Sequence, residues 1–129
     1  MPDRRQVFSP TSVDLGQSQR ASWLNWPAAN TSVVPAGYTL EVTTITCNFF
    51  PSAGATLGRA NISGRDAPDL GTGNAVWYFQ ALYVEPRRTL HLTFPDGLLV
   101  EENGHVAIGF YNEGPGTLFI ELHGALVLA

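Results

Sequence analysis

The C-terminal third of this chain contains three successive runs in which a large apolar side chain or a glycine recurs at every second position. Residues 89–94 and 106–110 alternate without a break, and residues 118–128 keep Leu, Ile or Gly at every second position. Neighbouring side chains of an extended strand point to opposite faces of the sheet, so this period of two places one row of side chains on a buried face. The pattern predicts an antiparallel sheet whose apolar face must be covered.

Further strands are predicted over residues 20–26, 38–50, 56–63 and 75–84, each bounded by turn-forming Gly, Pro or Asn. The change of phase at Thr43-Thr44 indicates a bulge in the longest of them. No segment has the periodicity of a useful amphipathic helix. We therefore expect an all-β fold, an antiparallel two-sheet sandwich of about eight strands.

Two turns share one scheme, in which an apolar residue and a glycine-containing turn precede an alternating strand. They occupy residues 34–42 and 100–108, with Gly37 and Gly104 in the turns. A glycine at such a position supplies the positive φ that reverses the chain. The repeat is typical of matching strands in the two Greek keys of a jelly roll.

At 129 residues the chain has the length of one domain. Residues 1–19 are polar, with little apolar content, and are expected to form an extended N-terminal arm or edge strand rather than core. We therefore divide the chain into an arm over 1–19 and a single β-sandwich, of jelly-roll type, over 20–129.

Composition excludes several classes of function. Charged residues are only 14% of the chain and the net charge is -4, whereas a nucleic-acid binder should carry a basic surface. No segment has the roughly 20 apolar residues of a membrane helix, and no apolar run follows the N-terminal charges as in a secretion signal. So few charges suggest that part of the surface is covered by a partner.

No arrangement of residues predicts catalysis, a metal or a cofactor. Cys47 is the only cysteine, so no internal disulfide forms, and its apolar neighbours at alternate positions predict a buried, inert thiol. His91 and His123 fall on the non-core face of their strands, and these two and His105 lack the spacing of a jelly-roll metal site. We expect all three histidines at a surface or an interface. The predicted function is non-enzymatic.

Aromatic residues offer the one binding signal. A flat platform for sugar rings, as in a carbohydrate-binding lectin-like module, could be formed by Trp23, Trp26, Trp77, Tyr78 and Tyr83, with Trp23 and Trp26 as the candidate sugar-binding residues. Alternatively, Trp77 and Phe79 belong to the core, while Trp23 and Trp26 close the edge of the sandwich. The sequence leaves both interpretations open.

The layout of residues 90–98, 104–108 and the final strand ending at 126–129 resembles small trimeric jelly-roll domains of the tumour-necrosis-factor-like or C1q-like kind. Viruses and bacteriophages use such domains as capsid decoration, head-spike or fibre-tip proteins. The resemblance covers roughly residues 34–129. It implies three copies around an axis, with sheet faces buried between subunits.

The same resemblance implies how such a protein would work. It would be a homotrimeric structural protein on the virion surface, made in the host cytoplasm and binding the major capsid protein or another virion protein. A host surface glycan is a further candidate partner. The N-terminal arm would dock on the particle, with contacts made by Arg4, Arg5, Val7 and Phe8.

Overall fold

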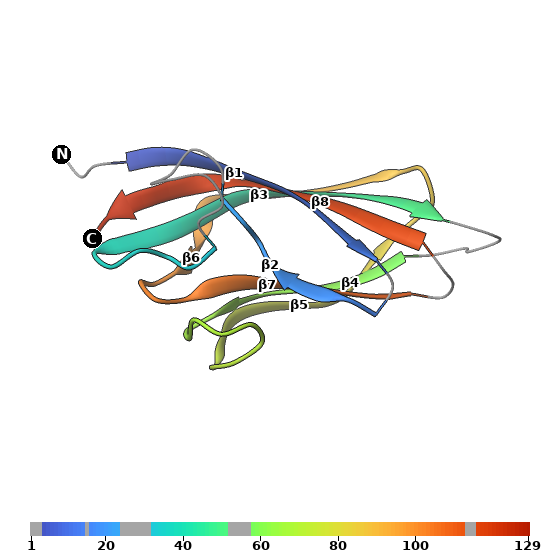
Figure 1. Cartoon of the computed structure of the whole chain (residues 1–129). Helices are drawn as coiled ribbons and strands as arrows, with labels where there is room; N and C mark the ends of the chain where they lie inside the picture. The colour runs from blue at the N-terminus through green and yellow to red at the C-terminus, as the bar shows by residue number, and fades with distance from the viewer. Residues whose placement is uncertain (1–3, 15, 24–31, 52–57, 113–115) are drawn as a thin grey trace.

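The computed structural model of this chain describes residues 4–14, 16–23, 32–51, 58–112 and 116–129. They form eight strands: β1 (Arg4–Asp14), β2 (Ser18–Arg20), β3 (Tyr38–Pro51), β4 (Gly58–Arg65), β5 (Ala75–Val84), β6 (Thr89–Val100), β7 (His105–Asn112) and β8 (Gly116–Leu128). Two four-stranded sheets lie face to face (Figure 1). The predicted all-β sandwich is confirmed.

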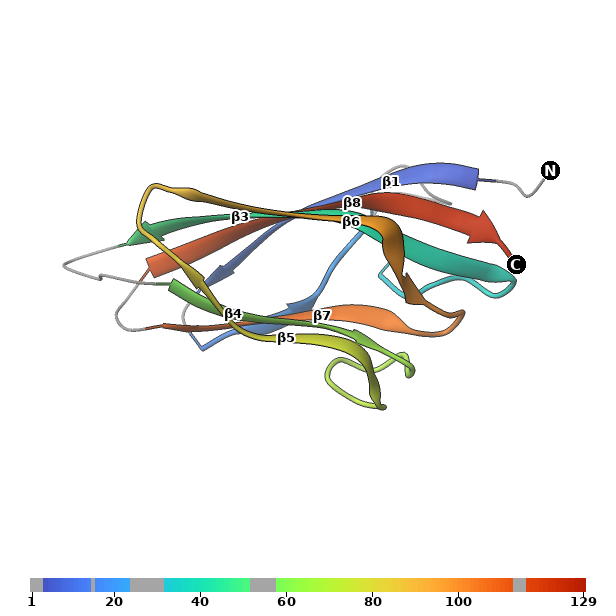
Figure 2. The same cartoon turned by 180° about the vertical axis from the view of Figure 1, so that it is seen from behind.

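The order of the strands identifies the topology. The first sheet has the order β1-β8-β3-β6 and the second sheet has the order β2-β7-β4-β5, with antiparallel pairing between the named strands. The chain crosses between the sheets after every strand except β4, as Figure 2 shows from behind. The first strand pairs with the last. This arrangement of two interlocked Greek keys is a jelly roll, as the sequence predicted.

Strand β8 shows how the alternation builds the sandwich. Leu118, Ile120 and Leu122 are completely buried, whereas Phe119 and the other outward-facing residues between them are exposed. Both neighbours of β8 in the first sheet pair with it along most of its length. Strand β8 is thus paired with a neighbouring strand on both edges and is covered by the core on one face.

The predicted bulge lies in β3. Its register with both neighbouring strands shifts between Val42 and Thr44. The shift allows Val42 before it and Ile45 after it to face the core. Gly124 faces this point on β8, and a Cβ there would lie 2.0 Å from the carbonyl oxygen of Glu41. Only glycine allows the two backbones to approach so closely.

The core is a single cluster between the sheets. Its largest completely enclosed apolar side chains come from five different segments of the chain: Trp23, Leu40, Ile45, Phe49, Ile62, Ile108, Leu118, Ile120, Leu122 and Leu126. Cys47 is part of it, as predicted, and burial raises the pKa of its thiol from an ordinary value of 9.0 to about 12. The core requires both sheets, because each supplies only one apolar face.

The two similar turns lie side by side. The amide of Val34 donates to the carbonyl of Gly104 (2.9 Å), and the amide of Asn103 donates to the carbonyl of Val34 (2.8 Å). Gly37 has the expected positive φ of 85°, but in the second turn the positive φ (66°) belongs to Asn103. Gly104 is required for another reason: a Cβ there would lie 2.4 Å from the carbonyl oxygen of Arg65.

The N-terminal segment differs from the arm that we expected over residues 1–19. All of β1 pairs with β8 at the edge of the first sheet, from Arg4 opposite Val127 to Asp14 opposite Thr117. Val7 and Val13 are buried in the core. Residues 4–14 are therefore an edge strand within the sandwich, the alternative to an extended arm that the sequence had also indicated.

Candidate functional site

The four residues expected to dock on a partner all lie in the edge strand β1: Arg4, Arg5, Val7 and Phe8. Arg4 and Val7 make contacts within the domain. Arg4 forms an ion pair with Glu41 (2.5 Å) and Val7 is only 3% exposed. The ring of Phe8 is half-buried against His123, with 4.6 Å between the ring centroids. Arg5 is exposed. Strand β1 thus contributes to the fold, and only part of its surface remains available to a partner.

The candidate sugar platform does not form around Trp23. This side chain is 1% exposed and lies in the core, so its ring offers no face to a sugar. Trp26 lies outside the described residues. Trp77 and Phe79 are partly buried and pack against the core, with 5.9 Å between their ring centroids, which agrees with the alternative interpretation of these two aromatics.

The histidines divide into two groups. His91 and His123 lie on the outer face of the first sheet, as expected, where they flank β3 opposite Thr46 and Thr44. His91 Nδ1 lies 3.0 Å from the hydroxyl of Thr46, and His123 Nε2 lies 3.9 Å from Glu121. No group of three or more potential metal ligands occurs among the residues that the structure describes.

His105 is completely buried, contrary to the expectation that all three histidines lie at a surface. It points to the outer side of β7, where the segment over residues 66–74 folds back and covers it. Its Nε2 accepts a hydrogen bond from the Gly71 amide (3.2 Å), and its Nδ1 lies 2.5 Å from the Ala67 carbonyl. A neutral ring with its proton on Nδ1 satisfies both partners.

Other contacts hold the same segment in place. The side chain of Asp66 accepts hydrogen bonds from the Asn74 amide (2.6 Å) and from the Asn74 side chain (3.4 Å). The guanidinium of Arg20 donates to the carbonyl of Pro68 (2.5 Å). The segment over 66–74 is thus fixed against the second sheet by the buried His105 and the partly buried Arg20.

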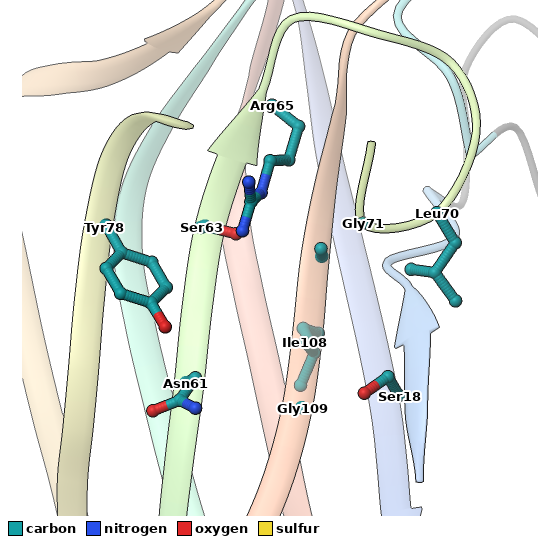
Figure 3. A pocket seen from close by; sticks show the side chains of 10 residues that line it. Ser18, Asn61, Ser63, Arg65, Leu70, Gly71, Tyr78, Ile108 and Gly109 are labelled. Atoms are coloured by element: carbon teal, nitrogen blue, oxygen red, sulfur yellow. The ribbon is translucent and has the colours of Figure 1, made fainter. Parts of the chain in front are cut away.

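This segment forms one wall of an open groove on the outer face of the second sheet (Figure 3). Leu70 and Gly71 lie on one side of the groove, and Tyr78 of β5 lies on the other. The groove, which we call the Arg65 groove, has a volume of about 360 Å³. Its lining consists of Ser18, Asn61, Ser63, Arg65, Leu70, Gly71, Tyr78, Ala107, Ile108 and Gly109.

The floor of the groove is low where three small residues, Ser63 of β4 and Ala107 and Gly109 of β7, face outward. Ser63 pairs with Ala107 across the two strands, and Gly109 follows two residues later on the same face. The inward neighbours Ile62 and Ile108 are large and belong to the core. The sequence signal for this groove is therefore confined to β7, where Ala107 and Gly109 alternate with the large inward side chains of Val106 and Ile108.

Arg65 supplies the charge of the groove. Its Nε donates to the hydroxyl of Ser63 (3.0 Å), and one terminal nitrogen lies 3.4 Å from the Gly73 carbonyl. The guanidinium carbon lies 5.9 Å from the centre of the Tyr78 ring. Among the described residues, no carboxylate forms an ion pair with Arg65, since the neighbouring Asp66 is occupied by Asn74.

The outer face of the first sheet has a different character. Phe50 and Phe119, which we call the aromatic patch, are 52% and 44% exposed and pack edge to face, with 5.2 Å between their centroids. The outward-facing side chains of β3 that follow the bulge are Thr44, Thr46, Asn48 and Phe50, and none of them is charged. Glu121 of β8 lines the same hollow as Asn48 and the aromatic patch, so this face carries one half-exposed carboxylate beside the two rings.

Comparison with known proteins gives a structural similarity only. No protein-family model and no curated protein matches the sequence. The fold is similar to that of a chain in the crystal structure of the T13 IBDV viral particle, with a TM-score of 0.51 and 10% sequence identity. The similarity covers 98% of this chain and 31% of that one. The part of this chain that the structure describes contains no helix long and apolar enough to cross a membrane. At this identity the likeness establishes a shared fold, seen in a viral particle.

Proposed function

We propose that this protein is a non-enzymatic structural protein of a virus or bacteriophage particle. It acts as a homotrimer that decorates the capsid or forms a head spike or fibre tip, and it binds the major capsid protein or another virion protein. The observation that carries the proposal is the jelly-roll topology over the whole described chain, together with the similarity to a viral-particle chain that covers 98% of the sequence.

The outer face of the first sheet supports self-association. A pair of exposed aromatic rings is unusual on a surface that faces only water, and such rings are enriched at protein interfaces. The neighbouring threonines and Asn48 carry no charge, and the one carboxylate that borders the patch, Glu121, lies 3.9 Å from His123. We therefore place the contact between copies on this face, around the aromatic patch.

A decoration trimer needs no catalytic centre. Several weak contacts made together give a high overall affinity, since the second and third contacts form at a high effective concentration. In the present fold these contacts come from surfaces of the sandwich, because β1 is part of the first sheet and is not a separate arm. The particle would thus be recognised by a folded trimer.

The proposal is tested by sedimenting the purified protein with virus particles from its own source. The wild-type protein is expected to sediment with the particles. Phe119→Asp places a charge in the aromatic patch and is expected to dissociate the trimer and to reduce binding to particles. Tyr83→Asp is the matched control, since Tyr83 is an aromatic residue of the second sheet that is 52% exposed.

Two results would contradict the proposal. A folded, trimeric protein that never sediments with particles would remove the virion role. Equal particle binding by Phe119→Asp and Tyr83→Asp, with both proteins still trimeric, would remove the aromatic patch from the contact between copies.

A further inference from the structure

We infer that the Arg65 groove binds a sugar that carries a carboxylate, such as a sialic or uronic acid unit. This inference goes beyond the proposed structural role and does not depend on the number of copies in the assembly. It places ligand binding on the outer face of the second sheet, away from the tryptophans that the sequence indicated.

The first argument is the charge of Arg65. Two other arginines have nearby carboxylates: Arg88 pairs with Glu85 (3.0 Å) and Arg4 pairs with Glu41 (2.5 Å). Arg65 instead contacts a hydroxyl and a carbonyl group, which orient the guanidinium but leave its charge without a carboxylate partner among the described residues. A planar guanidinium matches a carboxylate with two parallel hydrogen bonds.

The second argument is the wall opposite the loop. Tyr78 is 46% exposed, and its ring lies beside the Arg65 guanidinium. Figure 3 shows Tyr78, Asn61 and Ser63 along the same side of the floor, with Ser18 across from them. An exposed ring next to hydroxyl and amide groups suits a sugar, whose ring carries both C–H faces and hydroxyl groups.

The third argument is the shape of the site. The volume of about 360 Å³ lies at the lower end of the roughly 300–1,000 Å³ of small-molecule sites, so one or two sugar units fit better than a long chain. The small side chains of Ala107 and Gly109 allow a ring to lie close to the sheet.

The floor also disfavours an extended peptide. Peptides commonly bind sheets by adding a strand to a free edge. Here the floor belongs to β4 and β7, and β4 pairs with both β5 and β7 along the groove. A ligand must therefore be recognised by side chains from above, which favours a compact, functionalised ring.

The test is a titration of the whole protein, followed by amide NMR. The probes are the methyl glycosides of N-acetylneuraminic acid and of glucuronic acid, with methyl galactoside as the neutral sugar. We expect saturable shifts at the amides of Ser63, Ala107 and Gly109 with one or both acidic sugars, and at least tenfold weaker binding of the neutral sugar. Binding should weaken as salt is raised.

Three variants make the test specific. Arg65→Gln is expected to weaken binding of the acidic sugar at least tenfold, and Tyr78→Ala is expected to weaken binding of every sugar that binds. Arg88→Gln is the matched control and should bind as the wild type does, because Arg88 lies in a different part of the surface. The amide spectrum of each variant also reports whether it is folded.

Several results would overturn the inference. These are the absence of saturable binding of either acidic sugar to the folded protein, equal binding of acidic and neutral sugars, and unchanged binding by a folded Arg65→Gln protein. Equal shifts with acetate and with the acidic sugars would reduce the site to a carboxylate site and would also count against a sugar. Each of these results leaves the mass of the assembly and its binding to particles unaffected, so failure of this inference is distinguishable from failure of the structural role.

Discussion

The outer faces of the two sheets differ in both charge and relief. The first sheet presents threonines, Asn48, the aromatic patch and the carboxylate of Glu121, whereas the second sheet carries the Arg65 groove between Tyr78 and the segment over 66–74. Both sheets contribute large aliphatic side chains to the same core. One core can thus support two different outer surfaces, because the outward-facing residues of each strand do not contribute to the core and can differ between the sheets.

The largest effect on stability is expected from truncating a side chain on the buried face of β8, in comparison with one on its outer face. Ile120→Ala removes a completely buried side chain from β8 and should lower the free energy of unfolding by about 2–5 kcal/mol. Phe119→Ala, one residue earlier on the outer face, should cost about 1 kcal/mol or less but should weaken self-association. Urea unfolding and light scattering on both variants measure the two effects, and similar losses of stability would contradict the assigned faces.

The next effect concerns the wall of the Arg65 groove. His105→Ala leaves the Ala67 carbonyl and the Gly71 amide without their partner, and should lower the free energy of unfolding by about 1–3 kcal/mol. Hydrogen exchange at Gly71 should also become faster. His91→Ala is the control on the first sheet, where loss of an exposed contact with Thr46 should change stability by about 0.5 kcal/mol or less. Unchanged exchange at Gly71 in His105→Ala would mean that His105 does not fix the segment.

The buried thiol of the first sheet predicts a pH dependence. The pKa of Cys47 is raised to about 12 by burial, so the unfolded chain loses the thiol proton first as the pH rises above 9.0. The stability from this group is complete below that pH and is lost between 9.0 and about 12. From pH 8 to pH 10, wild-type stability should fall by about 1.4 kcal/mol more than that of Cys47→Ala. Parallel curves for the two proteins would contradict the assigned burial.

The smallest effect is expected at the edge of the first sheet. Arg4→Gln removes the ion pair with Glu41 and should cost less than about 1 kcal/mol, because both side chains are partly exposed. Val13→Ala removes buried apolar surface from the same strand and should cost more than Arg4→Gln does. The reverse order in urea unfolding would mean that charge, and not packing, holds β1 in place.

Sequence periodicity predicted the sandwich because each long strand keeps one apolar row. The same alternation predicted that β8 has one buried face, and its change of phase in β3 predicted the bulge near Thr43. Strand β1 was harder to place, since its inward row holds only Val7 and Val13 as buried apolar residues, with Ser9 between them. Such a strand gains most of its stability from pairing with β8, and pairing partners are not visible in a single sequence.

The candidate site was not predictable in the same way. Arg65, Tyr78 and Gly109 come from three different strands, and the second wall comes from a loop. The position of that loop depends on His105, which was expected only at a surface or an interface and lies on the outer side of β7. Its burial arises only when the segment over 66–74 folds back over it. Trp23 has the opposite outcome to Tyr78: it was a candidate for binding sugar at the surface, but its side chain is enclosed by the core.

The proposal of a homotrimer is tested most directly by the mass of the purified protein in solution, measured by light scattering and sedimentation over a range of concentrations. One copy has a mass of 13.9 kDa, so three copies give about 42 kDa. We predict a stable species of this trimeric mass, which Phe119→Asp converts to the monomer and Tyr83→Asp leaves intact. A wild-type protein that remains at 13.9 kDa at every concentration would contradict the proposal of a homotrimer assembled through the outer face of the first sheet.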